Sequence, residues 1–160
     1  MTHGVLLSLL LAAAATQTAQ VVSVHDGDTI TVRVNGRSEK IRLVGIDSPE
    51  LDDGRPEYRR AAYEARDYAR AQLAGEKVTL ESEPRQKDRD RYGRLLRYVI
   101  LEDGTNFDEC MVRKGYAHVF DKFQFAQKQR FKAAESAAKR EGLGVWALPP
   151  GPWRMTPEAR

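Results

Sequence analysis

The 160-residue sequence is poor in the residues that form disulfides or zinc sites. It has one cysteine, Cys110, and three histidines that are scattered along the chain. A single cysteine excludes an intramolecular disulfide and any zinc site built on cysteine. Beside Met111 and Val112, the Cys110 side chain is better interpreted as a small packed hydrophobic group than as a nucleophile.

Long hydrophobic runs are also scarce, and the one exception lies at the N-terminus. Charged residues make up 31% of the chain and the mean hydropathy is −0.57, which is typical of a folded globular domain. Residues 5–15 are apolar apart from Ser8, too short a run to span a bilayer but as long as the core of a signal peptide. We expect a signal peptide over residues 1–19, cleaved before Thr16 or Gln20, and export to the periplasm or the medium.

That assignment has a weak point, because residues 1–19 contain no lysine or arginine. A signal peptide usually begins with a positively charged segment. An uncleaved anchor and a wrongly assigned start therefore remain alternatives.

Alternating hydrophobic residues predict three short β-strands at the start of the mature chain. They cover residues 21–24, 29–34 and 38–44. Asn35-Gly36 between the second and third strands is a strong signal for a tight hairpin turn, because both positions of that turn need a positive φ. The second and third strands should therefore pair antiparallel.

The remaining elements complete a recognisable order. We expect a helix, two strands and two further helices, over residues 57–74, 77–81, 95–101, 106–114 and 125–141. Three strands, a helix and two strands are the order of the OB-fold, a five-stranded Greek-key barrel. The sequence thus predicts an α+β, β-rich single domain over residues 20–148 with about three packed helices, followed by a proline-rich tail over residues 149–160.

Acidic residues occur at two points that the predicted hairpin brings together. Asp28 comes just before the second strand, and Asp47 follows the third strand. Two carboxylates held close repel each other unless a cation neutralises them, and oxygen ligands select a hard ion, calcium in preference to magnesium. The alternatives are a simple turn at residues 26–28 and a local side-chain turn formed by Asp47 ahead of Pro49.

Two arginines are candidates for contacts with an anion. Strand alternation turns Arg42 away from the inward-facing Ile41 and Leu43, and Arg94 follows Gly93, which permits a tight bend. The alternative is that both are ordinary solvated arginines. The basic residues between positions 85 and 97 are mostly expected to be solvated or to make nonspecific phosphate contacts.

Three blocks, read together, resemble the thermonuclease family, the staphylococcal nuclease-like domains. They are Asp-Gly-Asp-Thr at 26–29, Arg-Leu-Val-Gly-Ile-Asp-Ser-Pro-Glu at 42–50 and Asp-Arg-Tyr-Gly-Arg at 90–94. The resemblance spans about residues 21–146. It implies an OB-fold that binds calcium and hydrolyses phosphodiester bonds of DNA and RNA, with little sequence specificity and 3′-phosphate products.

The resemblance also implies a role for each matching residue. The carboxylates of Asp28 and Asp47 and the backbone carbonyl of Ser48 would hold the metal. Glu50 would orient or deprotonate the attacking water, and two arginines would clamp the scissile phosphate. Those arginines are Arg42 and Arg94.

The match is incomplete where some members of the family carry two tyrosines that hold the nucleotide. Phe120 and Phe123 occupy that neighbourhood and, with Tyr92, are our candidates for stacking on substrate bases. Asp121 between the phenylalanines would repel a terminal phosphate if it pointed inward. We expect DNA and RNA as partners, no membrane span, no obligate protein partner and a monomer.

Two other function classes remain open at the level of sequence. One is an OB-fold module that binds nucleic acid without cutting it. The other is an interaction protein of the cell envelope that uses the barrel as a scaffold, although this would leave the grouping of Asp28, Asp47 and Glu50 without a purpose.

Overall fold

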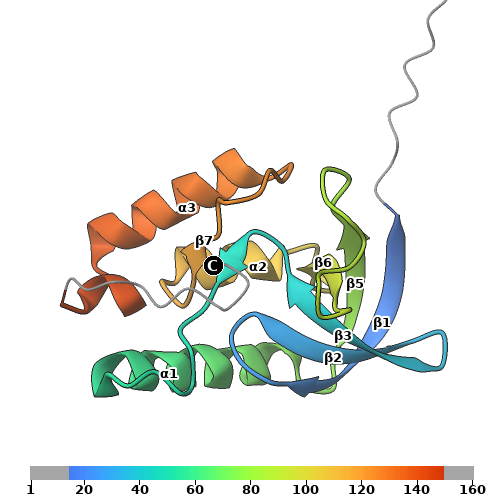
Figure 1. The fold of residues 1–160 in the computed structure, drawn as a ribbon, viewed down its shortest axis with the longest axis horizontal. Coiled ribbons are helices and arrows are strands. Elements are labelled where there is room, and N and C mark those ends of the chain that lie inside the picture. The colour runs from blue at the N-terminus through green and yellow to red at the C-terminus, as the bar shows by residue number, and fades with distance from the viewer. Residues whose placement is uncertain (1–14, 150–160) are drawn as a thin grey trace, which may run out of the picture.

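The computed structural model describes residues 15–149, and within that range five strands close a barrel. In barrel order they are β1 (Thr16–Val24), β2 (Thr29–Val34), β3 (Arg37–Leu43), β6 (Leu95–Ile100) and β5 (Lys77–Ser82) (Figure 1). All neighbouring pairs are antiparallel except β3 and β6, which run parallel. The predicted five-stranded OB-fold is confirmed.

The predicted hairpin is present and sets the register of the acidic residues. Asn35 and Gly36 have φ angles of 50° and 75°, as a tight hairpin turn requires. Thr29 then pairs with Arg42, and the amide of Leu43 donates to the carbonyl of Asp28 at 2.9 Å. This register places Asp28 beside the end of β3, where the chain continues toward Asp47.

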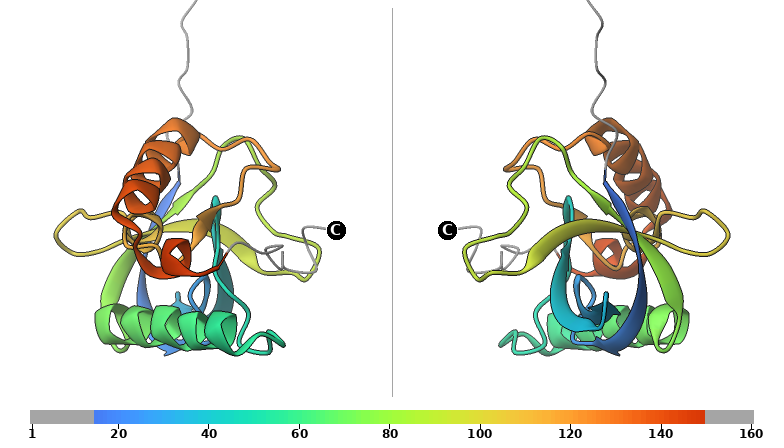
Figure 2. Two further views of the ribbon diagram at one scale, coloured as in Figure 1. Left: turned by 90° about the vertical axis from the view of Figure 1, so that its left-hand side faces the viewer. Right: turned by 90° about the vertical axis from the view of Figure 1, so that its right-hand side faces the viewer.

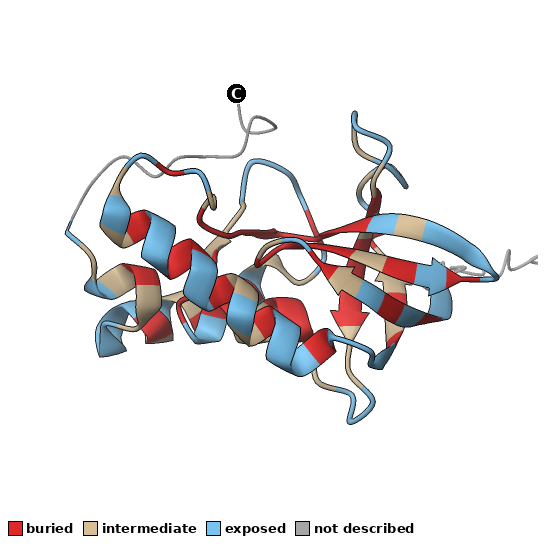
Figure 3. Cartoon of the chain, turned by 90° about the horizontal axis from the view of Figure 1, so that it is seen from below, coloured by how far each residue is buried: buried red, intermediate tan, exposed pale blue. Residues whose placement is uncertain are grey.

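Helix α1 (Pro56–Leu73) supports the loop that carries Asp28. Its buried stripe includes Ala61, Ala65 and Ala69, and Figure 3 shows it as a row of buried segments. A Cβ atom on Gly27 would lie 2.7 Å from Ser48 Cβ and 3.1 Å from Ala65 Cβ. Only glycine therefore fits between the helix and the segment that follows Asp47.

The other two α-helices of residues 15–149 pack against each other beside the barrel (Figures 1 and 2). Helix α2 (Phe107–Arg113) begins as predicted, with the side chain of Asn106 accepting from the Glu109 amide. Helix α3 (Lys128–Glu141) begins three residues later than predicted. The reason is Phe125, which is fully buried on the preceding loop, and whose ring fills the space where a Cβ on Gly45 would lie.

Three short elements were not predicted. Strand β4 (Ile46–Asp47) pairs with β7 (His118–Val119), and the 3₁₀ helix η1 covers Gly144–Ala147. The β4–β7 pair holds the backbone of Asp47 by pairing it with His118. Across residues 15–149 no helix has the length and apolar character needed to cross a membrane.

The described domain begins before the predicted boundary at residue 20. Strand β1 starts at Thr16, and its residues Thr16–Gln20 form the whole ladder with β5. Ala19 in this segment is buried. Barrel closure thus depends on residues that the predicted leader 1–19 includes. The rest of that leader and tail residues 150–160 lie outside the described residues.

A chain that starts at Gln20 should be much less stable than one that starts at Thr16. The shorter chain loses all of the β1–β5 ladder except the pair of Gln20 with Lys77, and at about 1 kcal/mol per backbone hydrogen bond we expect a loss of about 3 kcal/mol. For a domain of this size that lowers the melting temperature by roughly 10 °C. Thermal unfolding of the two chains, followed by circular dichroism, measures the difference. Equal melting temperatures would contradict a stabilising role for the β1–β5 pairing.

Candidate active site

A buried cluster of charges lies where β2, β3 and β4 meet. Arg42, Asp28 and Asp47 are 5%, 3% and 2% exposed. Arg42 Nη2 lies 3.4 Å from Asp28 Oδ2 and 3.1 Å from Asp47 Oδ1, while its Nη1 donates to the carbonyls of Leu43 and Ile46 at 2.9 and 2.8 Å. The solvated-arginine alternative for Arg42 is therefore wrong. Its guanidinium is a fixed, buried counter-ion.

The cluster holds more negative than positive charge. Burial alone would lower the pKa of the Arg42 guanidinium, but the charges of Asp28, Asp47 and Asp26 raise it above its ordinary value. Burial, followed by the charge of Asp28, raises the pKa of Asp26 to about 7. One guanidinium thus faces three carboxyl groups, and the surplus of negative charge favours an additional cation.

The donors present suit a hard cation that keeps part of its water shell. Asp28 Oδ2 accepts the amide of Ser48 at 2.8 Å, and Asp28 Oδ1 accepts the hydroxyl of Thr29 at 3.0 Å. These bonds orient the carboxylate and bring the Ser48 backbone beside it. Residues 15–149 contain no group of three or more ligating side chains. A hard metal ion at this point would take oxygen ligands from Asp28, Asp47 and the backbone, and water would have to supply the remaining ligands.

Arg94 lies just before β6 and reaches the same cluster through Thr29. Its Nε donates to Asp90 Oδ2 at 2.7 Å, and its Nη1 lies 3.4 Å from the hydroxyl of Thr29, the same hydroxyl that donates to Asp28. Gly93 has a φ of 79°, so the predicted bend before Arg94 is present. The three sequence blocks thus converge on Thr29.

Glu50 follows β4 and is half-buried. Its charge is among those that raise the pKa of Arg42, which places the carboxylate within electrostatic reach of the guanidinium. Its backbone carbonyl accepts the amide of Asp53 at 3.1 Å. Glu50 therefore stands at the start of a short turn that leads into α1.

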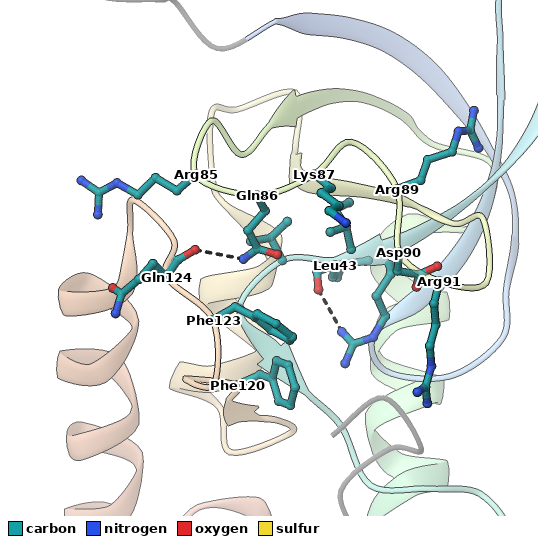
Figure 4. A pocket seen from close by; sticks show the side chains of 14 residues that line it. Leu43, Arg85, Gln86, Lys87, Arg89, Asp90, Arg91, Phe120, Phe123 and Gln124 are labelled. Atoms are coloured by element: carbon teal, nitrogen blue, oxygen red, sulfur yellow. Dashed lines mark hydrogen bonds between the residues drawn. The ribbon is translucent and has the colours of Figure 1, made fainter. Parts of the chain in front are cut away.

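A cleft of about 430 Å³ opens beside Arg42 (Figure 4). One wall is the loop that carries Arg85, Lys87 and Arg91, and the other carries Phe120 and Phe123. The two phenylalanine rings are 5.7 Å apart, and Phe123 is 53% exposed. A partly exposed aromatic pair opposite basic side chains has the chemistry to stack on nucleotide bases and to bind phosphates.

Tyr92, the third aromatic candidate, does not line this cleft. It is 55% exposed, and the guanidinium carbons of Arg91 and Arg94 lie 4.8 and 5.6 Å from its ring centroid. Tyr92 is therefore not part of the cleft wall that carries the phenylalanine pair, and its ring lies beside Arg94.

Asp121 does not line the cleft either. Its carboxylate pairs with Lys132 at 2.8 Å, and this contact lowers the pKa of Asp121. Other basic residues of α3 are paired in the same way, Arg130 with Glu109 and Lys139 with Glu135. The charged face of α3 is thus largely engaged in ion pairs of its own.

Glu83, which the sequence analysis missed, connects the two walls of the cleft. It is 4% exposed, and its carboxylate accepts the amide of Arg85 from one wall and the amide of Ala126 from the segment after the phenylalanine pair, both at 2.8 Å. The hydroxyl of Tyr98 donates to the same carboxylate. No local pattern around position 83 distinguishes this residue from the other acids of the loop.

Asp108 was missed for the same reason. It is fully buried on α2, and its carboxylate accepts the amides of Val44 at 3.2 Å and Val99 at 3.1 Å. Burial raises the pKa of Asp108 well above its ordinary value. The carboxyl group thus holds the backbone just after Arg42 where β3 and β6 part.

Comparison with known proteins gives consistent matches. The profile of the family described as Staphylococcal nuclease homologue matches residues 40–148. A thermonuclease of Staphylococcus hyicus is 33% identical over 132 residues, which are 82% of this chain and 76% of that protein. An uncharacterized endonuclease of Escherichia coli O157:H7 is 35% identical over 84% of this chain and 83% of its own length. A micrococcal nuclease of Shigella flexneri is 32% identical, with 84% and 78% covered.

Asp26→Asn should stabilise the protein at pH 8 in the presence of a chelator. A carboxyl group whose pKa rises on folding contributes stability below its unfolded pKa, near 3.8, and loses it as the pH rises through about 7. Asparagine keeps the acceptor for the Asp28 amide but cannot ionise. We expect a melting temperature a few degrees above that of the unmodified chain at pH 8, and no such advantage near pH 4. A variant that melts lower at pH 8 would contradict the charge surplus.

Proposed function

Since the chain belongs to the Staphylococcal nuclease homologue family, and is a hydrolytic nuclease on that ground, we propose that it is calcium-dependent. It hydrolyses phosphodiester bonds of DNA and RNA with little sequence specificity and leaves 3′-phosphate ends. The observation that carries this proposal is the buried cluster of Arg42, Asp28 and Asp47, joined to Arg94 through Thr29 beside an aromatic and basic cleft.

The two arginines bind the scissile phosphate and neutralise the charge that grows on its oxygens. The carbonyls of Leu43 and Ile46 hold Arg42 Nη1, and Asp90 holds Arg94 Nε, so both guanidinium groups are oriented before the substrate binds. To contact the phosphate, Arg42 Nη2 exchanges part of its contact with Asp28 and Asp47 for a phosphate oxygen. Donors that are fixed in advance stabilise a transition state more effectively than mobile ones, because no free energy is spent on ordering them during the reaction.

The carboxylates of Asp28 and Asp47 and a backbone oxygen of Ser48 would hold the calcium ion. When bound, the ion polarises a phosphoryl oxygen and neutralises developing charge. Glu50, close to the same cluster, orients the attacking water and accepts its proton. The water oxygen bonds to phosphorus as the bond from phosphorus to the 5′ oxygen breaks. The leaving 5′ oxygen takes up a proton from solvent to become a hydroxyl, and the phosphate remains on the 3′ oxygen.

The cleft accounts for weak sequence specificity. Phe120 and Phe123 offer ring faces on which any base stacks, and Lys87 and Arg91 on the opposite wall suit the phosphate backbone. Phosphate contacts position a nucleic acid without reading its sequence. The cleft thus favours binding of an extended strand with its bases unpaired.

Export remains part of the proposal, with cleavage before Thr16. A cut there leaves β1 whole, whereas a cut before Gln20 removes Thr16–Ala19 and leaves only Gln20 of the β1 residues that pair with β5. The completeness of the barrel supports the earlier site.

Long DNA should be cut by the chain from Thr16 when calcium is present and left intact with excess chelator. Magnesium should support little or no cutting. The oxygen ligands of this site suit the flexible coordination of calcium, whereas magnesium requires a near-ideal octahedron at shorter distances. Gel electrophoresis follows product length, and phosphatase-dependent end labelling identifies 3′-phosphate ends. Salt-sensitive retention of DNA without cutting would instead favour a binding module.

Arg42→Gln and Glu50→Gln should each lower kcat by about 10² to 10³, the usual cost of removing one transition-state contact. Arg33→Gln is the matched control, because Arg33 is exposed on β2 and outside the cluster. Calcium should still raise the melting temperature of Glu50→Gln, since Asp28 and Asp47 remain. Full activity of either site variant would contradict the mechanism.

A further inference from the structure

The loop between Glu50 and α1 contains a carboxylate that is unexpectedly buried. Asp53 is 2% exposed although it lies in a short, polar connection. Its Oδ1 accepts the backbone amide of Arg55 at 2.9 Å and Arg55 Nε at 3.0 Å, and its Oδ2 accepts Arg55 Nη2 at 2.9 Å. A bidentate arginine–carboxylate pair of this kind is stronger and geometrically stricter than a single charged hydrogen bond.

The backbone of Asp53 also makes two hydrogen bonds, one toward Glu50 and one toward α1. Its amide donates to the carbonyl of Glu50 at 3.1 Å, and its own carbonyl accepts Arg59 Nη1 from α1, also at 3.1 Å. The Arg55 guanidinium lies 3.6 Å from the ring centroid of Tyr58 on the first turn of α1. The loop is therefore fastened to the helix through Asp53.

Helix capping does not account for this arrangement. The N-cap of α1 is Arg55, whose own side chain accepts no capping hydrogen bond from the helix. The atoms that Asp53 satisfies belong to Arg55 and to the turn that starts at Glu50. The Asp53 side chain thus binds Arg55 just before the helix, and the Asp53 amide ties this point to Glu50.

Glu50 consequently lies between two fixed points. On one side the amide of Ser48 is bonded to Asp28, and on the other the Glu50 carbonyl is bonded to Asp53. We propose that Asp53 is a positioning residue that holds Glu50 in the orientation needed to direct the attacking water. This inference rests on the proposed nuclease mechanism and adds a residue to it.

Asp53→Asn tests the proposal, with Asp103→Asn as the matched control. Asp103 also accepts a backbone amide two residues ahead, that of Thr105 at 2.9 Å, but on the exposed loop between β6 and α2. We expect Asp53→Asn to lower kcat about tenfold to hundredfold, since small misplacements of a reacting group have effects of this size. KM for DNA and the calcium-induced rise in melting temperature should not change, and Asp103→Asn should cut like the unmodified chain.

A double variant separates positioning from general loss of stability. In the Glu50→Gln background, Asp53→Asn should cause little further loss of kcat, because its effect passes through Glu50. Arg55→Lys, which keeps the charge but not the bidentate pair, should lower kcat in the same direction by a smaller factor. Equal fractional losses in both backgrounds would overturn the proposal.

Hydrogen exchange supplies a readout that does not depend on activity. The amides of Asp53 and Arg55 should exchange faster in Asp53→Asn than in the unmodified chain, and the amides of the barrel strands should not. Faster exchange with undiminished kcat would overturn the positioning role. If the unmodified chain cuts no DNA with calcium, the proposed function is wrong. The role of Asp53 in positioning Glu50 then falls with it, whatever the exchange rates of the loop.

Discussion

The guanidinium of Arg42, buried between Asp28 and Asp47, is the constraint on which the rest of the site depends. Two carboxylates could not lie this close in a buried position without a positive partner, since each would raise the free energy of the other's charged form. The partner has to be rigid, and the carbonyls of Leu43 and Ile46 hold it. The hairpin register, the short β4–β7 pair and the alanine face of α1 all serve to keep these groups in contact.

Buried acids outside the cluster extend this rigidity to its surroundings. Asp108 holds the backbone just after Arg42, Glu83 joins the two walls of the cleft, and Asp53 fastens the loop after Glu50. Each accepts at least one backbone amide, so each fixes the path of the main chain as well as a side chain. A catalytic geometry built on loops acquires in this way the precision of one built on strands.

Local signals were sufficient for most of the fold and for the meeting of Asp28 with Asp47. The Asn35-Gly36 turn and the strand alternation determine the hairpin, and the hairpin determines which acids become neighbours. The alternation of residues along β3 also predicts the face on which Arg42 lies. It does not predict what covers that face, so the burial of the Arg42 side chain was not predictable. The start of α3 was misjudged because Phe125 continues the helical hydrophobic pattern while it packs as a loop residue. Glu83 and Asp108 accept amides that are distant in sequence, which no short pattern encodes. The partners of Asp53 are local, but its burial depends on how the whole loop packs.

Barrel closure affects the rate of folding as well as the stability of the folded domain. Strand β1 pairs with β5, and β3 pairs with β6. In both cases the two strands are far apart in sequence. Distant contacts require loop closure before they contribute any free energy, and domains dominated by them fold slowly. The β2–β3 hairpin can form at once, but Arg42 acquires its buried surroundings only when the barrel closes. The ion pairs of Arg42 are thus local to the hairpin and the residues that follow it, but the burial that strengthens them depends on strand pairs that are distant in sequence.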